Sequence, residues 1–500
     1  MKYAKVLSSL CGGLSVLAFA PWHQMWAAFV SFSVLVWLLL NAKTAKESFV
    51  RGYCFGFFHF ALGFSWVGNA LLIDAETFGW LYPVTLGGAG FFFGLFFAIP
   101  AWIAFYAKQN WQKWGVFCSC VVIGEWLRCF IFTGFPWNLI GYNLAFSAEL
   151  IQFAAVGGTL LLSLVSLLCY SVFGLVVFQK DKISWGWGLL FCVAVFGGLY
   201  GFGQYRLAHQ ENLETDKVIK IVQPSIPQTL KWDRVSAEDN FKEYIDLTEQ
   251  SEIKVPDLII WGETASPFIL DKDDFHRNMV NDVLPEKSYL VTGMIHYTLE
   301  DEEYIPHNSL AVFDKAGDLV DYYYKSHLVP FGEYIPLRNL LPNFLRPIAN
   351  QIGTFGRGDG PKVIALDGLP TFGGVICYEI IFPHEIVKQN QRPEFLINLS
   401  NDGWYGDSAG PYQHWEAAKL RAVEDGMTVV RAANNGISGM ISAYGEEIAK
   451  LELNKKGTLV FNLFRSVNQT FYGKFGNSVT LTFCLILLFL GFINKVNFRG

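Results

Sequence analysis

Eight apolar segments constrain this chain more than any other feature of its 500 residues, 52% of which are hydrophobic. Segments of this length and apolarity predict membrane-spanning helices. The first, second and last are short for a bilayer, so they need tilt or local thinning to span it. The sequence therefore predicts a polytopic α-helical membrane domain with eight spans. The segments are Val6–Ala20, Met25–Leu40, Gly52–Ile73, Phe78–Tyr106, Trp114–Phe132, Ile151–Phe178, Ile183–Gly203 and Ser478–Ile493.

The positive residues predict how these spans are oriented. Alternate loops and the two ends of the chain carry nearly all the Lys and Arg of the membrane part, whereas the intervening short loops carry Arg128 at most. Cationic loops remain on the cytoplasmic side of a membrane. Both termini are therefore expected in the cytoplasm, and the long polar stretch before the last span is expected outside. In a bacterium this places the polar domain at the periplasmic face of the inner membrane.

Charge divides the chain into three predicted parts. Residues 1–203 form spans one to seven, residues 204–470 form the extracytoplasmic domain, and residues 471–500 form span eight with a cytoplasmic tail. The extracytoplasmic domain holds 25 Lys or Arg and 38 Asp or Glu, a net charge of −13. A domain this acidic is a poor candidate for binding nucleic acid.

The extracytoplasmic domain alternates short apolar runs with helical stretches. Runs of this kind predict strands that are buried on both faces, in an α/β layered domain. Hairpins are expected over Ser309–Lys325, and over Thr428–Leu453 with a turn at Tyr444-Gly445. Helices are expected over Ala237–Gln250 and Gln413–Asp425. The predicted strands are Val218–Val222, Leu258–Trp261, Tyr289–Met294, Gly373–Cys377 and Phe395–Asn398.

Three predicted strand ends carry residues that can do chemistry. Glu263 follows one strand, Lys325 ends another, and Cys377 ends a third and is the only cysteine of residues 204–470. A thiol needs a base to become a thiolate and a nearby cation to stabilise it. Glu263 can supply the base, and Lys325 can stabilise the thiolate and a later oxyanion. Taken singly, however, a cysteine at a strand end is more often inert core, and such charges are more often solvated.

Longer motifs decide between these two interpretations. Glu263, Lys325 and Cys377 follow one another in the order of the Glu-Lys-Cys triad of the nitrilase, or carbon–nitrogen hydrolase, superfamily. The runs 325–334 (KSHLVPFGEY) and 377–379 (CYE), with the seven-plus-one arrangement of spans, resemble the apolipoprotein N-acyltransferase family, the membrane-embedded branch of that superfamily. The similarity extends over essentially the whole chain. One departure is Gly262, where many nitrilases have proline before the catalytic glutamate.

The resemblance implies an α-β-β-α sandwich and a ping-pong acyl transfer through a thioester. Glu263 would take the proton of Cys377, whose sulfur would attack an ester carbonyl of a phospholipid. The preferred phospholipid of the family is phosphatidylethanolamine. The α-amine of the N-terminal diacylglyceryl-cysteine of an apolipoprotein would then accept the acyl chain. Lys325, with backbone amides near Tyr378, would hold the oxyanion in both steps.

Further residues receive supporting roles in this interpretation. Glu333 could orient Lys325 or relay a proton, and Glu379 could support the lysine or the thiol. Residues 334–355 are apolar enough to predict an arm that rests on the membrane or covers the acyl site, with Leu340 and Phe344 as substrate-binding residues. Trp232 could line the same entrance, although a buried core tryptophan is an alternative.

Several classes of site and function are disfavoured. The histidines of residues 204–470 show no metal-ligand spacing, so no zinc is expected, and no phosphate loop or dinucleotide fingerprint predicts a cofactor. A membrane-anchored amidase would share the triad, but it gives no reason for eight spans. A transporter or sensor would need charged residues within the spans, which hold almost none beyond Glu125 and Arg128. These two, one helical turn apart, could pair with each other.

Overall fold

The chain folds into two compact units. The computed structural model describes residues 3–177, 182–211, 214–300, 302–336, 354–388 and 390–493. The first unit combines Met1–Gln210, Tyr405–Glu424 and Gln469–Gly500, and the second combines Glu211–Trp404 and Asp425–Asn468. The segment Tyr405–Glu424, which we expected within the extracytoplasmic domain, thus groups by its contacts with the apolar helices.

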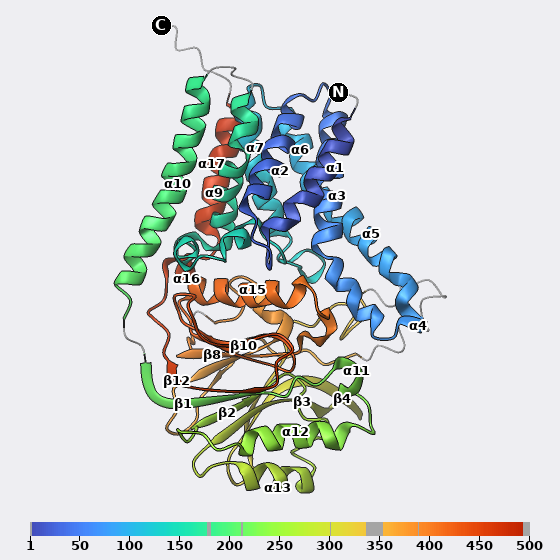
Figure 1. The fold of residues 1–500 in the computed structure, drawn as a ribbon, viewed down its shortest axis with the longest axis vertical. Coiled ribbons are helices and arrows are strands. Elements are labelled where there is room, and N and C mark those ends of the chain that lie inside the picture. The colour runs from blue at the N-terminus through green and yellow to red at the C-terminus, as the bar shows by residue number, and fades with distance from the viewer. Residues whose placement is uncertain are drawn as a thin grey trace. The chain divides into compact units, whose positions relative to one another are not determined.

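The first unit is helical, and every predicted span contains helix. Several of its long helices run beside one another, as Figure 1 shows for α1, α2, α3, α7, α9 and α17. The long elements are α1 Ala4–Ser15, α2 Met25–Leu40, α3 Ala45–Gly63, α5 Tyr82–Phe93, α6 Leu95–Phe105, α7 Asn110–Leu127, α9 Ala154–Val176, α10 Lys182–Ala208 and α17 Ser478–Phe492.

Length and apolarity divide these helices into two groups. Among the described residues, three helical stretches can cross a membrane by these criteria, namely Ala75–Phe105, Ala154–Val176 and Ser184–Ala208. A fourth is possible if Ala45–Gly63 and Ser65–Leu72, bent by 41°, form one span. Ala4–Ala18, Met25–Leu40 and Ser478–Phe492 are shorter apolar helices. The membrane helices are therefore supported, whereas the count of eight stays a prediction.

Two helix crossings in this unit depend on glycine. A Cβ on Gly12 of α1 would lie 2.1 Å from the carbonyl oxygen of Phe55 in α3. A Cβ on Gly174 of α9 would lie equally close, 2.1 Å, to the carbonyl oxygen of Ser33 in α2. Small residues allow helix backbones to approach this closely in apolar surroundings. The glycines therefore fix which faces of these helices pack together.

The prediction that Glu125 and Arg128 pair with each other is wrong. Glu125 accepts a hydrogen bond from the backbone N–H of Ile140 at 2.7 Å. The Arg128 guanidinium donates to the carbonyl of Trp137 at 3.1 Å and lies over the Phe60 ring, 5.0 Å from its centroid. No ion pair joins the two side chains in the described part of the chain. The contacts of these two side chains are instead with backbone groups and an aromatic ring.

The second unit contains two six-stranded sheets. The first has the order β12-β1-β2-β3-β4-β5, and the second has the order β11-β10-β9-β8-β7-β6. Each has three adjacent parallel strands, β1-β2-β3 in one and β7-β8-β9 in the other, flanked by antiparallel strands. The bounds are β1 Glu214–Gln223, β2 Leu258–Trp261, β3 Tyr289–Glu300, β4 Glu303–Phe313, β5 Leu319–Tyr324, β6 Val363–Ile364, β7 Phe372–Ile376, β8 Phe395–Ser400, β9 Val429–Ala433, β10 Ser438–Ile441, β11 Glu447–Leu451 and β12 Gly457–Phe464.

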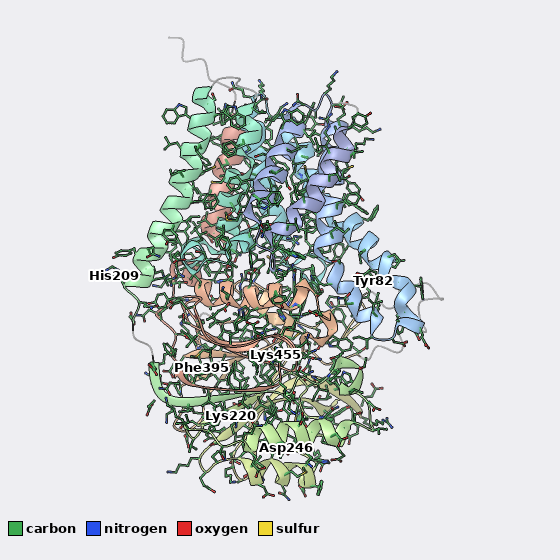
Figure 2. All side chains as sticks on the ribbon, in the orientation of Figure 1. Tyr82, His209, Lys220, Asp246, Phe395 and Lys455 are labelled. Carbon is green, nitrogen blue, oxygen red and sulfur yellow. The ribbon has the colours of Figure 1, made fainter. Side chains whose placement is uncertain are left out.

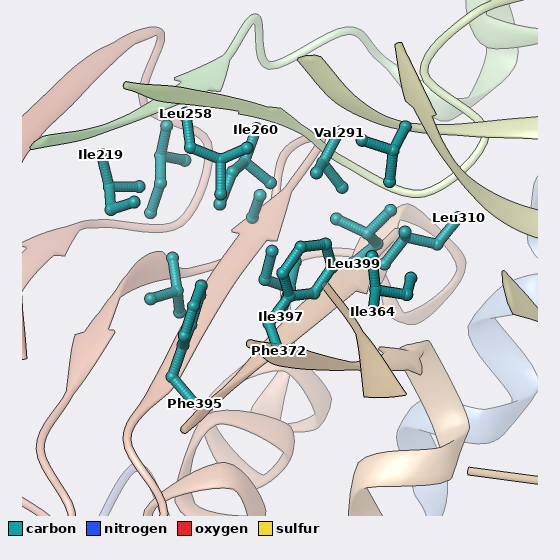
Figure 3. Packing of buried hydrophobic residues seen from close by; sticks show 14 of the residues in the cluster. Ile219, Leu258, Ile260, Val291, Leu310, Ile364, Phe372, Phe395, Ile397 and Leu399 are labelled. Atoms are coloured by element: carbon teal, nitrogen blue, oxygen red, sulfur yellow. The ribbon is translucent and has the colours of Figure 1, made fainter. Parts of the chain in front are cut away.

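The two sheets pack face to face around one apolar core. Figure 3 shows side chains of the first sheet, among them Ile219, Ile260 and Val291, against Phe372 and Ile397 of the second. Every one of these side chains is buried. Alternate residues of each strand point to this face, so the β-branched and aromatic residues of the short apolar runs fill the space between the sheets.

Helices cover the other face of the first sheet. They are α12, Ala237–Glu249, and α13, Asp274–Val283, which lie over the sheet in Figure 1. α12 buries Phe241, Tyr244 and Ile245, whose helical spacing gives it one apolar face against Trp261. This sheet-on-sheet arrangement with outer helices confirms the predicted nitrilase-like α/β class.

Most predicted strands are present, with two differences. Residues 428–453 form three strands rather than one hairpin, because a turn at 434–437 separates β9 from β10 before the expected turn at Tyr444-Gly445. The strand expected to end at Cys377 ends at Ile376, and Cys377 begins a short 3-10 helix, η8 Cys377–Ile381. The thiol therefore sits on the turn between a strand and a helix.

Candidate active site

The structure brings the three predicted catalytic residues into one charge cluster at the strand ends. Glu263 follows β2, Lys325 follows β5, and Cys377 follows β7. The first two come from one sheet and the third from the other. All three side chains are buried. Charged groups are rarely buried unless they are paired, so their common burial points to a built site rather than to solvated strand ends.

Lys325 is held between two carboxylates. Its Nζ lies 2.9 Å from Oε1 of Glu333 and 3.4 Å from Oε1 of Glu263. Burial alone lowers the pKa of Lys325, but the charges of Glu333 and Glu263 outweigh it, and the pKa lies above its usual value. The lysine is therefore an ammonium throughout the physiological pH range, as a group that stabilises an oxyanion must be.

Asn308 joins the same two carboxylates and was not predicted from the sequence. It lies on β4, and its Nδ2 donates to Oε1 of Glu263 at 2.8 Å and to Oε1 of Glu333 at 2.9 Å. Asn308 thereby fixes the separation of the two acids that flank Lys325. Asn308 lies just before the hairpin expected over Ser309–Lys325, so no predicted element singled it out.

Glu333 also holds the loop that carries it. Its Oε2 accepts the backbone N–H of Val329 at 2.8 Å, while its Oε1 contacts Lys325. The short segment between them is thus closed on itself. This geometry agrees with the prediction that Glu333 orients the lysine.

Cys377 occupies a backbone conformation that side chains rarely adopt. Its φ is 49°, in the left-handed region, at the point where β7 gives way to η8. Non-glycine residues in this region are uncommon and cluster at functional sites. At this turn the thiol lies within reach of the charges of Glu263 and Lys325, which follow strands of the other sheet.

The thiol is protonated at rest. Burial raises the pKa of Cys377 to about 12; the negative charge of Glu263 acts in the same direction, and Lys325 opposes it. A preformed thiolate is therefore scarce near neutral pH, and the proton must leave as the sulfur attacks. Such an arrangement needs a base beside the thiol, which is the role predicted for Glu263.

Glu379 ties the lysine loop to the cysteine turn. Its Oε1 accepts from the hydroxyl of Tyr323 at 2.8 Å, from the backbone N–H of Ser326 at 2.7 Å and from that of His327 at 3.0 Å. Its Oε2 accepts the backbone N–H of Ile376 at 2.7 Å. Among the described residues, Glu379 therefore contacts the loops that carry Lys325 and Cys377, rather than the ammonium itself.

The end of β8 and the residues that follow it contact the backbone of Glu263 and hold a buried ion pair. Arg431 donates to Oδ2 of Asp402 and to Oγ of Ser400, at 2.9 Å and 3.0 Å, and all three residues are buried. The Ser400 carbonyl in turn accepts the backbone N–H of Glu263 at 3.3 Å. Asp402 thus contributes a buried ion pair beside the strand that contacts the backbone of Glu263.

Gly262 has a steric reason for lacking a side chain. A Cβ at this position would lie 3.0 Å from the Ala433 carbonyl carbon and 3.0 Å from the Asn434 nitrogen. That is tighter than ordinary contacts. The backbone before Glu263 therefore passes close to the end of β9, which accounts for a residue other than proline here.

The predicted substrate-binding residues have different outcomes. Trp232 is 52% exposed, so the alternative of a buried core tryptophan is wrong. It follows the short helix α11, Gln228–Lys231, whose last residue contacts the backbone of Glu263. Trp232 thus lies beside the site. Leu340 and Phe344 fall in residues 337–353, outside the described residues. Tyr378 is buried next to Cys377, 5.1 Å from the ring of Phe382.

A separate cavity of about 360 Å³ lies behind the catalytic loops. Its lining includes Ser326, His327 and Arg357, together with Glu379 of η8 and Phe382, which follows η8. None of the three predicted catalytic residues lines it. Within the described residues, no group of three or more His, Cys, Asp and Glu side chains is arranged to hold a metal ion.

Comparisons with known proteins cover both units. Residues 11–172 match the family model of the apolipoprotein N-acyltransferase N-terminal domain, and residues 221–470 match that of the carbon-nitrogen hydrolases. An apolipoprotein N-acyltransferase of Rhizobium rhizogenes is 33% identical over 524 residues, covering 98% of this chain and 97% of its own. That of Rickettsia prowazekii is 33% identical over 503 residues, with 100% of both chains covered.

A third relative and one solved structure complete the comparison. The apolipoprotein N-acyltransferase of Rhizobium meliloti is 36% identical over 472 residues, covering 90% of this chain and 88% of its own. An amidase from Nesterenkonia sp. aligns with 54% of this chain and 96% of its own, at 15% identity and a TM-score of 0.38. That structural likeness is too distant to support an argument about the site.

Proposed function

Because this chain belongs to the apolipoprotein N-acyltransferase family, we propose that it moves an acyl chain from a phospholipid to the N-terminal amine of an apolipoprotein. The acceptor amine is that of a diacylglyceryl-cysteine, and Cys377 carries the acyl chain between the two substrates. The observation that carries this assignment is the buried cluster in which Lys325 contacts Glu263 and Glu333, with Cys377 within its electrostatic reach.

In the first half-reaction, Cys377 becomes acylated. Glu263 takes the proton of the thiol as Sγ attacks the ester carbonyl carbon of the phospholipid. The bond between that carbon and the glycerol oxygen then breaks, and the oxygen takes the proton from Glu263. A thioester remains on Cys377 and the lysophospholipid leaves. Because the thiol has a pKa of about 12, transfer of its proton during the attack is required.

In the second half-reaction, the amine takes the acyl chain. The neutral α-amine of the apolipoprotein attacks the thioester carbonyl, and Glu263 takes a proton from the nitrogen. The C–S bond breaks, the proton passes to Sγ, and an amide forms. Cys377 returns to the thiol, so the cycle needs neither an external oxidant nor a cofactor.

Lys325 acts in both half-reactions, because both pass through a tetrahedral oxyanion. A fixed ammonium beside that oxygen lowers the energy of the transition state without any reorganisation. Glu333 and Asn308 keep the ammonium in place, since both contact the same set of atoms. Backbone amides near Tyr378 complete the oxyanion site in this proposal.

Both substrates are lipids, which gives the apolar helices a reason to accompany a nitrilase-like domain. We place the protein in the inner membrane with both termini in the cytoplasm and the catalytic domain in the periplasm. Phosphatidylethanolamine is the proposed donor. Trp232, Leu340 and Phe344 are proposed to contact acyl chains, for which the 52% exposure of Trp232 beside the site is direct support.

A transfer assay with matched acceptors tests this function. The purified full-length protein is mixed with phosphatidylethanolamine that carries a labelled acyl chain and with a diacylated lipopeptide. The label should move to the lipopeptide with a free α-amine and not to one whose amine is acetylated. Release of labelled fatty acid at the same rate without any lipopeptide would instead identify a hydrolase that uses water.

A further inference from the structure

A second buried lysine contacts the catalytic glutamate. Lys231 ends the short helix α11, is only 6% exposed, and donates from Nζ to the backbone carbonyl of Glu263 at 2.8 Å. An ammonium has three N–H donors. Among the described residues, the Glu263 carbonyl is the one acceptor that Lys231 reaches. Burying an ammonium with so few hydrogen-bond partners lowers the stability of the fold. A role in the site gives a reason for keeping the lysine there.

Another buried lysine of the same unit shows what a structural ammonium looks like. Lys220, labelled in Figure 2, is 1% exposed, and its Nζ donates to the carbonyls of Thr248 and Gln250 at 3.0 Å and 2.8 Å. It also lies 3.3 Å from Oε1 of Glu252. Lys220 thus reaches three acceptors, including a carboxylate. Lys231 reaches one carbonyl, which belongs to the proposed base.

The position of Lys231 is fixed by its own short helix. Gln228, at the start of α11, accepts a hydrogen bond from Asn401 Nδ2 at 2.9 Å, which anchors the helix beside the end of β8. The neighbours Leu230 and Trp232 point outward, 44% and 52% exposed, while Lys231 points inward. The lysine is therefore directed into the site by its register on the helix.

The groups that face Lys231 are those of the proposed reaction. Burial lowers the pKa of Lys231 to about 8, whereas the charges of Glu263 and Cys377 raise it. Cys377 is further influenced by Lys325 and Asp402. Lys325 stays charged at higher pH, since its pKa lies above the usual value. Lys231 is thus the cation of this cluster that loses its charge just above neutral pH.

We propose that Lys231 is a positioning residue that holds the main chain of Glu263 and adds a second positive charge that favours the Cys377 thiolate. This inference rests on the proposed function, because it takes Cys377 as the nucleophile. The charge acts on the sulfur through space and the hydrogen bond acts on the base through its backbone. The charge effect is present while Lys231 is protonated, below pH about 8, and fades as the pH rises past that value. The hydrogen bond to the Glu263 carbonyl can persist, because a neutral amine still carries N–H donors.

Alkylation of Cys377 by iodoacetamide tests the charge effect without any lipid substrate. The full-length protein in detergent is labelled between pH 6 and pH 9.5, and the peptide that contains Cys377 is quantified by mass spectrometry. Lys231→Met should react about threefold to tenfold more slowly at pH 7, which corresponds to a thiol pKa raised by about half a unit to one unit. The difference should shrink above pH about 8, where the wild-type lysine loses its charge.

Two further variants separate charge from packing. Lys231→Arg keeps the charge at every pH and should stay close to the wild-type rate at pH 7. Lys220→Met removes another buried lysine, whose contacts are with Thr248, Gln250 and Glu252. This change should leave the alkylation rate of Cys377 unchanged, even if the melting temperature falls. Equal rates for Lys231→Met and wild type from pH 6 to pH 8 would overturn the proposal.

If Lys231→Met does not fold, the pH dependence of the wild-type alkylation rate tests the proposal. Its alkylation rate should rise tenfold per pH unit below pH about 8 and less steeply through the next unit, as the second charge is lost. A uniform tenfold rise over the whole range would contradict the proposal. Failure of the proposed function is a distinct result, since a phospholipid acyl adduct on a residue other than Cys377 would reject the mechanism whatever the alkylation rates are.

Discussion

One buried pair of charges in the helical unit and one buried cluster in the α/β unit are held in different ways. In the helical unit, Glu125 and Arg128 lie one turn apart, yet their contacts are with backbone groups and an aromatic ring rather than with each other. In the α/β unit, Lys325 is shared by two carboxylates, and Asn308 bridges the same two acids. Isolated charges with local partners serve the fold, whereas a cluster with shared partners can move protons and stabilise an oxyanion.

The comparison predicts the largest loss at the nucleophile. Cys377→Ser should reduce acyl transfer to less than roughly a thousandth of the wild-type rate, because a serine hydroxyl is far less acidic than a thiol and a carboxylate cannot deprotonate it. Single-turnover transfer from labelled phospholipid measures this. Thermal unfolding serves as the control, and a folded variant that retains near-normal transfer would exclude a thioester on Cys377.

The second largest loss of rate is expected for the proposed base, Glu263. Glu263→Gln keeps the shape of the side chain and can still accept from Asn308, but it cannot take the thiol proton. Thioester formation should slow by roughly 10²–10⁴, the range expected for loss of a general base. Rapid-quench measurement of the acylation step checks this. Normal acylation in this variant would assign the base to another residue.

Lys325 should affect both half-reactions rather than one. Lys325→Met should slow acylation and the subsequent transfer to lipopeptide each by about 10²–10³, since an oxyanion forms in both steps. It also leaves Glu263 and Glu333 buried without their cation, so the protein should unfold at a lower temperature. Separate single-turnover assays distinguish the steps. A variant slowed in acylation alone would remove Lys325 from the second step.

The smallest effect is expected in the helical unit. Glu125→Gln retains an oxygen that can accept from the backbone of Ile140, so both fold and chemistry should persist. Acylation should stay within about twofold of wild type, because the hydrogen bond of this side chain is to a backbone group of its own unit. Loss of acylation in a folded Glu125→Gln variant would contradict the claim that the residues of the reaction all lie in the α/β unit.

The sequence predicted the strand ends that carry chemistry, because those residues adjoin apolar runs whose type is easy to recognise. Glu263, Lys325 and Cys377 were placed on the correct side of β2, β5 and β7. The two-sheet class followed from short strands buried on both faces, and the motif resemblance added the α-β-β-α sandwich.

Contacts between distant segments could not be predicted in the same way. Asn308 bridges Glu263 and Glu333 because of the register between β3 and β4, and Lys231 reaches Glu263 because α11 is anchored at Asn401. Neither register nor docking can be read from spacing in one sequence. The left-handed backbone of Cys377 is a further tertiary effect, since the apolar run predicts extended backbone up to and including Cys377.

Peptide mapping of the acyl adduct tests the central claim most directly. The full-length protein is mixed with phosphatidylethanolamine without lipopeptide, quenched in acid and digested, and the acylated peptide is identified by mass spectrometry. The account predicts one acyl chain on the peptide that contains Cys377, its removal by hydroxylamine, and its loss when diacylated lipopeptide is added. An acyl chain on any other residue, or none on Cys377 while transfer proceeds, would contradict it.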